Sequence, residues 1–503
     1  MNFKSIKLAG NLNTIVVLTF VVTILLSSPL VNTFQIDPDE GLELSKAMLV
    51  EEGYTLYSQI WNDQPPLFTN ILAMIIGVFG NSLLAARLVT LAFSGLLIWT
   101  IFKIMETFGN LGMAVISALL LLLTEPFLHI SFAVMRGLPA ITLAAVSVLG
   151  MMLWHKSGKS EQLVISAVAL ALSVATKLFT LIVAPILFLG VLISDWNKPT
   201  KQKAFVGNYK ASTIWVGVFV VSSGLVFLYF VGAENILQLV LPHFEATSTE
   251  GFEFAGIVFS PVILVLAGLG SVLIVRERNW VMLYPVAWML FAYILLVNYY
   301  PAWYHQKLLF SVPAAMVAAY PIHFAYVSLR EILQRQAGQK LAEKGKYFIL
   351  GGLIMVLALL LNNLRLQNSE QPPSQASSIG NIRNEWNDKQ TRNLQLVERF
   401  AADSEWMLTD LPIYAFRAGI LTPPNTVVLS KKRILTGNLT EDELIQTVAD
   451  YQPDQVLLGR FEFPDLVDYL GEAYSVVSCE GSGIKLFVSN ALLEKAGPLP
   501  ECD

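Results

Sequence analysis

Apolar runs separated by short polar segments fill residues 1–364 of this 503-residue chain. Most runs approach the roughly 20 residues that an α-helix needs to cross the hydrocarbon core of a bilayer. The runs cover 12–31, 66–80, 83–103, 111–135, 138–154, 162–194, 211–232, 255–275, 279–298, 303–327 and 347–363. This pattern predicts a polytopic α-helical membrane protein with about 11–13 transmembrane helices.

Two of these runs need an interior break. The run 162–194 has about 33 residues, too many for one crossing at about 1.5 Å per residue, and we expect it to turn at Thr176-Lys177. The run 111–135 contains Glu125-Pro126, and proline removes a backbone donor and kinks a helix. Counting that run as two short helices gives about thirteen crossings, which places the two termini on opposite sides of the membrane.

Composition supports the membrane assignment. Apolar residues make up 54% of the chain and charged residues 14%, and the mean hydropathy is +0.58. A soluble chain of this length does not need so high a ratio of apolar to charged residues. No cluster of basic residues of the kind that binds nucleic acid is present in the sequence. Residues 11–30 follow two lysines, but the run is long enough to be a retained first helix rather than a cleaved signal peptide.

The basic residues orient the chain. Several loops carry clusters of lysine or arginine and should face the cytoplasm; they lie near 156–159, 198–210, 276–278 and 330–346. The loop 233–254 has glutamates and no lysine or arginine, so it belongs on the other side. This orientation places the acidic segment Thr33–Leu67, Lys177, the turn at 298–305 and the C-terminal tail outside a cytoplasmic (inner) membrane.

The chain changes character beyond Leu364. We predict a transmembrane domain at 1–364, a polar linker at 365–385 and a small soluble α/β domain at 386–503. Helical patterns occur at 387–403, 440–451 and 463–471, and β-like runs at 406–409, 426–429, 455–458, 475–477 and 485–488. Both cysteines, Cys479 and Cys502, lie here, and we expect two free thiols, with a disulfide as the alternative.

The segment Thr33–Leu67 carries seven carboxylates and one lysine between two apolar runs. Asp37, Asp39 and Glu40 follow the first run, and Asp63 precedes the second. We expect an amphipathic interfacial helix between them to fold the segment back and to bring these acids over one site. There a carboxylate could act as a general base toward an acceptor hydroxyl. The alternative of equal weight is a solvated acidic loop.

Cationic and hydrogen-bonding groups occur at the same predicted surface. Lys177 lies between two apolar stretches and could bind a lipid phosphate, unless it only extends to the interface. Arg136 could share that role, whereas Arg87 suits a structural ion pair. His305 could hydrogen-bond a phosphate or sugar hydroxyl, and Tyr304 belongs to an aromatic group that fits an interfacial belt equally well.

The order of several motifs resembles the GT-C membrane glycosyltransferases, in the branch of the protein O-mannosyltransferases and the bacterial lipid A aminoarabinose transferases. The resemblance covers about residues 12–330, and the tail segment LPIYAFRAGILTPP resembles the extracytoplasmic domain of bacterial members. The motifs are DPDEGLELSKAMLVEEGYTLYSQIWNDQPPL, FGNSLLAARLVT, the TK of LSVATKLFTLIVAPIL, and YHQKLLFSVPAAMVAAY.

The resemblance implies transfer of a sugar from a polyprenyl-phosphate donor, with inversion, at the outer membrane face. Asp39 matches the catalytic base of the family and Glu40 its companion. Asp63 matches the second acidic position before PPL, and Lys177 matches the donor-phosphate contact.

Two positions depart from the family pattern. Gln64 stands where many relatives have a lysine, and Asp37 supplies a second candidate base. One-step inversion needs a base for the acceptor hydroxyl and a cation for the leaving phosphate. Lys177, with Arg136 or His305, provides that cation without a metal or other cofactor; assistance by a divalent cation is the alternative.

The expected partners are a polyprenyl-phosphate-linked sugar, membrane lipids, and an acceptor that is a glycan, lipid or protein. An oligosaccharide transferase or glycan polymerase is the nearest alternative. A transporter or flippase of lipid-linked sugars is a further one, although no internal repeat is visible. A ligand sensor with a membrane anchor is the third, but an anchor has no need of Lys177 within its helices.

Overall fold

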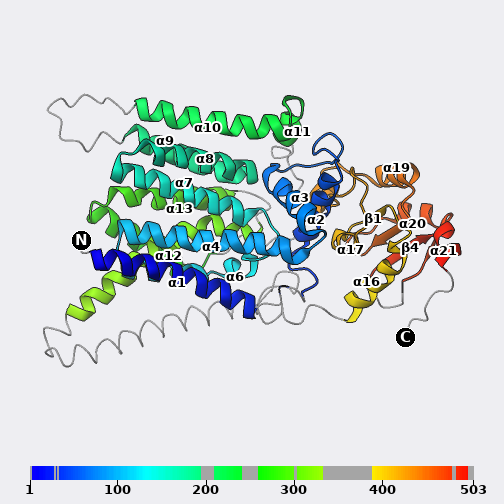
Figure 1. Cartoon of the computed structure of the whole chain (residues 1–503), viewed down its shortest axis with the longest axis horizontal. Helices are drawn as coiled ribbons and strands as arrows, with labels where there is room; N and C mark the ends of the chain where they lie inside the picture. Colours follow the sequence, from blue (N-terminus) through cyan, green and yellow to red (C-terminus); the bar gives the residue numbers. More distant parts are fainter. Residues whose placement is uncertain are drawn as a thin grey trace.

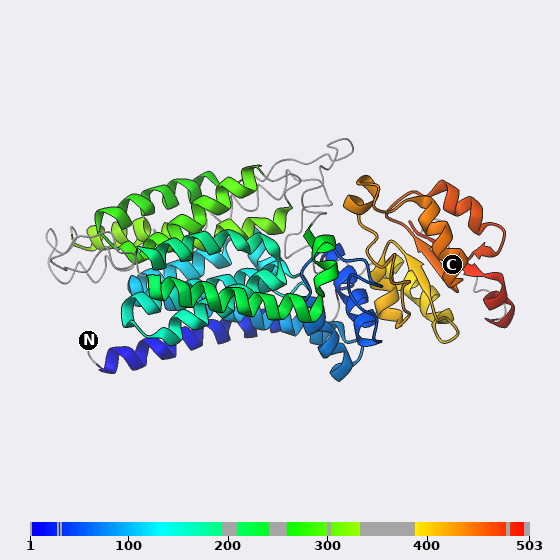
Figure 2. The ribbon, with the colours of Figure 1, turned by 90° about the horizontal axis from the view of Figure 1, so that it is seen from above.

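A bundle of long helices packs end-on against a small α/β domain in the computed structural model (Figures 1 and 2). The structure describes residues 3–27, 30, 33–193, 209–240, 259–298, 303–331, 388–478 and 483–496. The apolar run 347–363, the predicted linker 365–385, both cysteines and the basic loop residues at 198–208 and 332–346 lie outside the described residues.

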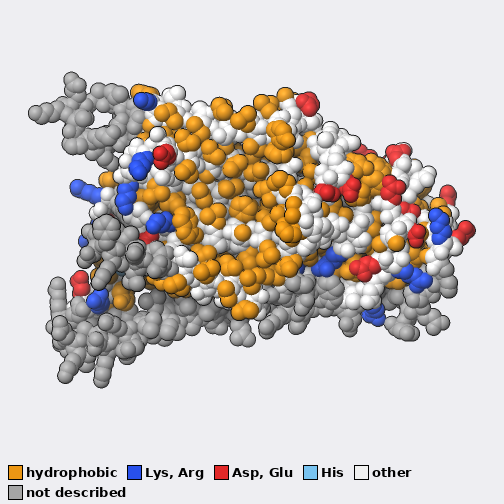
Figure 3. Space-filling model, viewed as in Figure 1, with side chains coloured by type: hydrophobic (Ala, Val, Ile, Leu, Met, Phe, Trp, Pro, Cys, Tyr) orange, Lys and Arg blue, Asp and Glu red, His pale blue; other side chains and the backbone are white. Residues whose placement is uncertain are grey.

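The bundle confirms a multi-pass membrane protein. Five of the described helices are long and apolar enough to cross a membrane, and apolar side chains cover the flank of the bundle in Figure 3. The bundle elements are α1 (Phe3–Ser27), α4 (Leu83–Phe108), α5 (Leu111–Leu122), α7 (Gly137–Ser157), α8 (Ser160–Thr176), α9 (Val183–Leu192), α10 (Tyr209–Phe230), α12 (Pro261–Arg276), α13 (Leu283–Asn298) and the helix Tyr304–Glu331.

Both predicted helix breaks are present. Lys177 has an extended backbone between α8 and the 3-10 turn η1 (Leu178–Ile182), which leads into α9. The run 111–135 divides into α5 and the short α6 (Glu125–Ile130), with Pro126 in the first turn of α6. Proline fits the first turn of a helix because a backbone N–H at that position would have no acceptor within the helix.

Two apolar runs do not cross as predicted. The run 66–80 forms α3 (Leu67–Phe79), only 13 residues, which packs beside α2 (Pro38–Glu51) at the end of the bundle where α4 begins (Figure 1). A helix of this length spans about 20 Å, which is short for a bilayer core. One side of α3 packs in the cluster that includes α2, where Phe68, Leu72 and Ile76 are buried, whereas Met74, Val78 and Phe79 of the same helix are exposed.

The run 111–135 makes one leg of the bundle rather than two. Near its start, a Cβ built on Gly112 would lie 2.8 Å from Cδ2 of His323. At its end, the rings of His129 and Tyr304 have centroids 5.7 Å apart. His323 and Tyr304 are separated by about 28 Å along one helix at 1.5 Å per residue, so α5 and α6 together traverse that length once.

The two ends of the bundle differ in charge. Lys156 ends α7 and Arg276 ends α12, and Figure 3 shows basic side chains at the end of the bundle away from the α/β domain. We call the opposite end, which carries Arg87, Lys177 and Tyr304, the domain end, because the α/β domain packs there (Figure 1). Under the positive-inside rule, the end of a bundle that carries the basic residues faces the cytoplasm, which is the basis of the predicted orientation.

The α/β domain contains a four-stranded sheet of order β1-β2-β4-β3, in which β1 is parallel to β2 and the other pairs are antiparallel. Four predicted strands and three predicted helices are confirmed, whereas 426–429 is not a strand and the helices α17, α18 and α21 were not predicted. The elements are α16 (Asp388–Ala401), β1 (Met407–Thr409), α17 (Pro412–Ala418), α18 (Lys431–Leu435), α19 (Glu441–Tyr451), β2 (Gln455–Leu458), α20 (Pro464–Leu470), β3 (Tyr474–Val476), β4 (Lys485–Ser489) and α21 (Asn490–Ala496).

One apolar core joins the α/β domain to the acidic segment. Phe34, Leu44 and Phe68 belong to the same buried cluster as Ile413 and Phe416 of α17. The two parts approach closely at Gly41 of α2, where an added Cβ would lie 2.6 Å from the backbone nitrogen of Ile413. The domain is therefore packed directly on the helix that carries the candidate acids.

Candidate active site at the domain end

Helix α2 begins at the acids that sequence analysis selected. Asp37 is the N-cap, and its Oδ1 accepts a hydrogen bond of 2.9 Å from the backbone N–H of Asp39. Pro38 occupies the first turn, and Asp39 and Glu40 follow it. Each choice favours a helix start: the cap satisfies a free N–H, proline has the required φ, and carboxylates oppose the positive end of the helix dipole.

The expected interfacial helix is instead buried. Every residue of α2 from Glu40 to Leu49 is buried. The reason is that α3 and α17 both pack on α2, which leaves few of its residues in contact with solvent or lipid. The acids of α2 are therefore held in fixed positions and are not part of a solvated loop.

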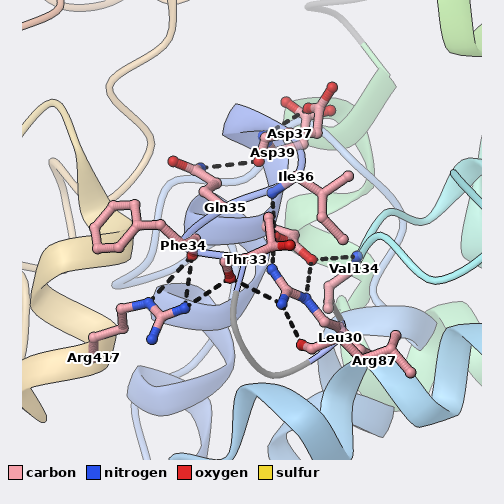
Figure 4. Close-up of polar contacts among 11 residues, drawn as sticks. Leu30, Thr33, Phe34, Gln35, Ile36, Asp37, Asp39, Arg87, Val134 and Arg417 are labelled. Atoms are coloured by element: carbon pink, nitrogen blue, oxygen red, sulfur yellow. Dashed lines mark hydrogen bonds and ion pairs between the residues drawn. The ribbon is translucent and has the colours of Figure 1, made fainter. Parts of the chain in front are cut away.

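Glu40 and Arg87 form a buried ion pair at the base of this segment. The Arg87 Nε and Nη2 atoms donate to Oε1 and Oε2 of Glu40 at 3.0 and 2.9 Å. Glu40 also accepts hydrogen bonds from the backbone N–H groups of Ile36 and Val134 (Figure 4). Arg87 is thus an ion-pair partner as expected, and the Glu40 oxygens are fully used in fixing the start of α2.

Asp37 lies at the contact between α2 and the helix Tyr304–Glu331. The Tyr304 hydroxyl donates a hydrogen bond of 3.1 Å to Asp37 Oδ2. Burial, and next the neighbouring Asp39 charge, raise the pKa of Asp37 to about 7. Asp37 therefore combines a structural role, as the cap, with a position in the site.

The Asp39 carboxylate accepts no hydrogen bond within the described parts of the chain. Its charge nevertheless acts on four basic groups, Lys46, Arg136, Lys177 and His305. A carboxylate with open lone pairs, placed beside basic groups and near the start of a helix, is suited by its position to accept a proton as a general base.

Lys177 and His305 come together beside these acids. Lys177 Nζ and His305 Nε2 are 3.4 Å apart, and Lys177 Nζ lies 5.1 Å from the centre of the Phe179 ring. Gly137, the first residue of α7, faces the same pair: its added Cβ would lie 3.8 Å from Lys177 Nζ. A small residue here leaves space next to the ammonium group.

Arg136 completes the cationic side. Its Nη2 forms an ion pair with Glu43, while its buried Nη1 has no hydrogen-bond partner in the described parts of the chain. A buried guanidinium nitrogen without a partner is costly and is usually satisfied by water or a ligand. Arg136, Lys177 and His305, the three predicted phosphate contacts, therefore occupy one site.

Glu43 is a residue of this site that the sequence motifs did not single out. It is buried, and besides Arg136 it binds Lys46 Nζ at 3.1 Å and accepts a hydrogen bond from Thr69. Lys46 in turn donates to Asn62. The available signal was that Glu43 and the segment's only lysine are one helical turn apart, where side chains meet.

Asp63 lies on the side toward the α/β domain. Its Oδ2 is 3.9 Å from Lys432 Nζ of α18, and its charge acts on both Lys46 and Lys177. The structure thus brings Asp37, Asp39, Tyr304, Lys177, His305 and Arg136 together, with Glu40–Arg87 on one side and Asp63 on the other. Among the described residues, no group of three or more acidic, histidine or cysteine side chains is placed to hold a metal ion.

A family model described as dolichyl-phosphate-mannose-protein mannosyltransferase matches residues 63–227. This range begins at Asp63 and includes Arg136 and Lys177. No curated protein matches the sequence.

Solved structures share the fold over nearly the whole chain. ArnT from Cupriavidus metallidurans in the apo state has a TM-score of 0.61 and 12% identity, covering 97% of this chain and 99% of that one. The same protein bound to undecaprenyl phosphate has a TM-score of 0.56 and 14% identity, with coverage of 99% and 100%.

The Archaeoglobus fulgidus oligosaccharyltransferase in its apo form has a TM-score of 0.57 and 10% identity, covering 89% of this chain and 69% of that one. Together the family match and the shared fold confirm the resemblance to the GT-C membrane glycosyltransferases, and the fold class with it.

Proposed function

We propose that this chain is an inverting glycosyltransferase that moves one sugar from a polyprenyl-phosphate-sugar to an acceptor hydroxyl at the outer face of the cytoplasmic membrane. The observation that carries the proposal is that the carboxylate of Asp39, which accepts no hydrogen bond from the described residues, lies within electrostatic range of three basic groups, Arg136, Lys177 and His305. The carboxylate and the three basic groups come from four separate segments that meet at the domain end.

In the reaction, Asp39 removes the proton of the acceptor hydroxyl as the acceptor oxygen bonds to the anomeric carbon. The bond between that carbon and the phosphate oxygen breaks at the same time, and polyprenyl phosphate leaves with the electron pair. Attack opposite the leaving group inverts the anomeric configuration.

The cations bind the phosphate. The open Nη1 of Arg136 and the ammonium group of Lys177 can hydrogen-bond phosphate oxygens and stabilise the charge that develops as the bond breaks. The solved ArnT structure with undecaprenyl phosphate supports a lipid phosphate as ligand, since that protein shares this fold. We expect turnover without a metal cofactor, and hence in the presence of a chelator.

Glu40 has a positioning role in this proposal, because the side chain of Arg87 and two backbone N–H groups use its oxygens. Asp37 orients the start of α2 and shares the electrostatic field of Asp39. Asp63 contributes to the charge balance of Lys46 and Lys177.

The test is transfer by purified protein from defined polyprenyl-phosphate hexoses and pentoses to glycan, lipid and peptide acceptors. Asp39→Asn should abolish turnover and leave donor binding intact; Lys156→Ala, at the far end of the bundle, is the control and should leave both unchanged. Full turnover by Asp39→Asn would remove Asp39 as the base and move that role to Asp37 or Asp63.

Transfer of a preassembled oligosaccharide is the second candidate, favoured by the fold shared with the archaeal oligosaccharyltransferase. Donors that carry one sugar or several distinguish the two. Labelling of a cysteine introduced on the exposed residue Arg460, from outside intact cells, tests the orientation; labelling only after lysis would overturn it.

A further inference from the structure

The backbone that leads into the acids, Thr33–Ile36, has no regular secondary structure, so helix bonds do not satisfy its carbonyl groups. Both Thr33 and Phe34 are buried. Their carbonyl oxygens accept hydrogen bonds from arginines instead, and Asp37 follows three residues after Phe34.

Arg417 of the α/β domain supplies most of these bonds. Its Nη2 donates to the carbonyl oxygens of Thr33 at 3.0 Å and of Phe34 at 2.8 Å, and its Nε donates to that of Phe34 at 3.2 Å. The guanidinium carbon lies 4.9 Å from the centre of the Phe34 ring. Figure 4 shows Arg417 approaching the segment from the α/β domain.

Arg87 of α4 holds the same backbone from the bundle. Its Nη1 donates to the carbonyl oxygens of Thr33 at 3.0 Å and of Leu30 at 2.5 Å. The Thr33 carbonyl therefore accepts from two arginines, one from each domain (Figure 4). The remaining donors of Arg87 go to Glu40, so this network ends on the first turn of α2.

A simple ion pair between Arg417 and a carboxylate would not require these hydrogen bonds to backbone carbonyl groups. Arg417 donates to backbone carbonyls in a fork geometry that a lysine cannot reproduce. The negative charges of Glu40 and Glu398 favour the charged form of the Arg417 guanidinium group, whereas the positive charge of Arg87 disfavours it. What the contacts fix is the path of the chain immediately before the candidate base.

We propose that Arg417 is a positioning residue for the transferase, through which the α/β domain sets the location of Asp37 and Asp39 relative to Lys177 and His305. The inference rests on the proposed function for its catalytic consequence. Its structural content, the restraint of residues 33–40 by Arg417, is testable without it.

The kinetic test compares the full-length wild type with Arg417→Ala, Arg417→Lys and the control Arg460→Ala, an exposed arginine of the same domain. We expect Arg417→Ala to lower kcat by about tenfold to a hundredfold, as for a small misplacement of a reacting group. Donor KM should stay within about twofold, because the cations are not displaced. Arg417→Lys should recover only part of kcat. An unchanged kcat for Arg417→Ala would overturn the inference.

Amide hydrogen exchange provides the second readout and needs no activity. Residues 33–44 should exchange faster in Arg417→Ala, with α7 and α8 unchanged and Arg460→Ala like wild type. Faster exchange throughout the protein would indicate a merely structural role and contradict the proposal, as would unaltered exchange at 33–44. An inactive wild type with the predicted exchange pattern would refute the proposed function but not the restraint.

Discussion

The Tyr304 hydroxyl donates a hydrogen bond to the carboxylate of Asp37, so the N-cap of α2 is tied to the start of a helix far along the chain. Burial, and next the neighbouring Asp39 charge, raise the pKa of Asp37 from 3.8 to about 7, although the hydrogen bond from Tyr304 acts in the opposite direction. Between these values the folded protein keeps a proton that the unfolded chain has lost. Stability should therefore fall as the pH rises through this window.

Asp37→Asn should remove this component of the pH dependence. Asparagine caps a helix about as well as aspartate through its Oδ1 atom, and its Nδ2 group can donate to the Tyr304 hydroxyl oxygen in place of the bond that Asp37 accepts. We expect the thermal midpoint of the wild type to decline more steeply between about pH 4 and pH 7 than that of the variant. Differential scanning fluorimetry in detergent at several pH values measures it, and parallel profiles would show that Asp37 does not titrate there.

Glu43→Gln should destabilise the protein. The substitution leaves Lys46 and Arg136 buried without their shared counter-charge, and breaking a buried pair in this way costs about 3 kcal/mol. Glu106→Gln is the matched control, because the Lys103–Glu106 pair at 2.9 Å is partly exposed and such pairs contribute below about 1 kcal/mol. Equal shifts in the unfolding midpoint of the two variants would contradict the central place of Glu43.

Hydrophobic length predicted the helical bundle and both of its breaks, because a bilayer imposes a minimum length and proline or lysine interrupts a run visibly. Hydrophobic length did not distinguish helices that cross the membrane from apolar helices that pack against other parts of the protein. The residues of α3 are as apolar as those of a crossing helix, but the helix has only 13 residues and its buried side packs against α2. The position of α3 depends on its tertiary contacts with α2 and the α/β domain, and a hydropathy pattern carries no information about such contacts.

The sequence motifs selected the acids and cations that meet at the domain end, because charge next to an apolar run is costly and noticeable. They did not reveal the use of each group. Glu40 and Asp39 are adjacent in sequence, yet one binds Arg87 and the other accepts no hydrogen bond in the described part of the chain. Arg417 had no sequence signal, since its partners are backbone carbonyls.

Lys177→Ala should weaken binding of polyprenyl phosphate. Loss of one hydrogen bond to a charged group costs about 1.5–3 kcal/mol, which raises Kd by about tenfold to a hundredfold. Lys177→Arg should retain part of the affinity because the charge is kept. Binding of polyprenyl phosphate to purified protein by isothermal titration calorimetry measures this, with Lys156→Ala as control. Wild-type affinity in Lys177→Ala would exclude a phosphate contact.

Gly41→Ala tests the packing of the α/β domain on α2 with two opposed effects. Helix propensity alone favours alanine over glycine by about 1 kcal/mol. At Gly41, however, the new Cβ would lie 2.6 Å from the Ile413 backbone nitrogen and 3.1 Å from its Cα. Because that neighbour is main chain, α17 has to move, and overpacking of this kind costs about 1–3 kcal/mol.

Gly77→Ala in α3 is the matched control, since its Cβ would meet nothing closer than a Glu51 side-chain oxygen at 3.5 Å. We expect a higher thermal midpoint for Gly77→Ala and a lower one for Gly41→Ala. The displacement of α17 should also loosen the bonds from Arg417 to Thr33 and Phe34, so kcat should fall in Gly41→Ala alone. A stabilised and fully active Gly41→Ala would mean that the α/β domain does not hold α2 in its working position.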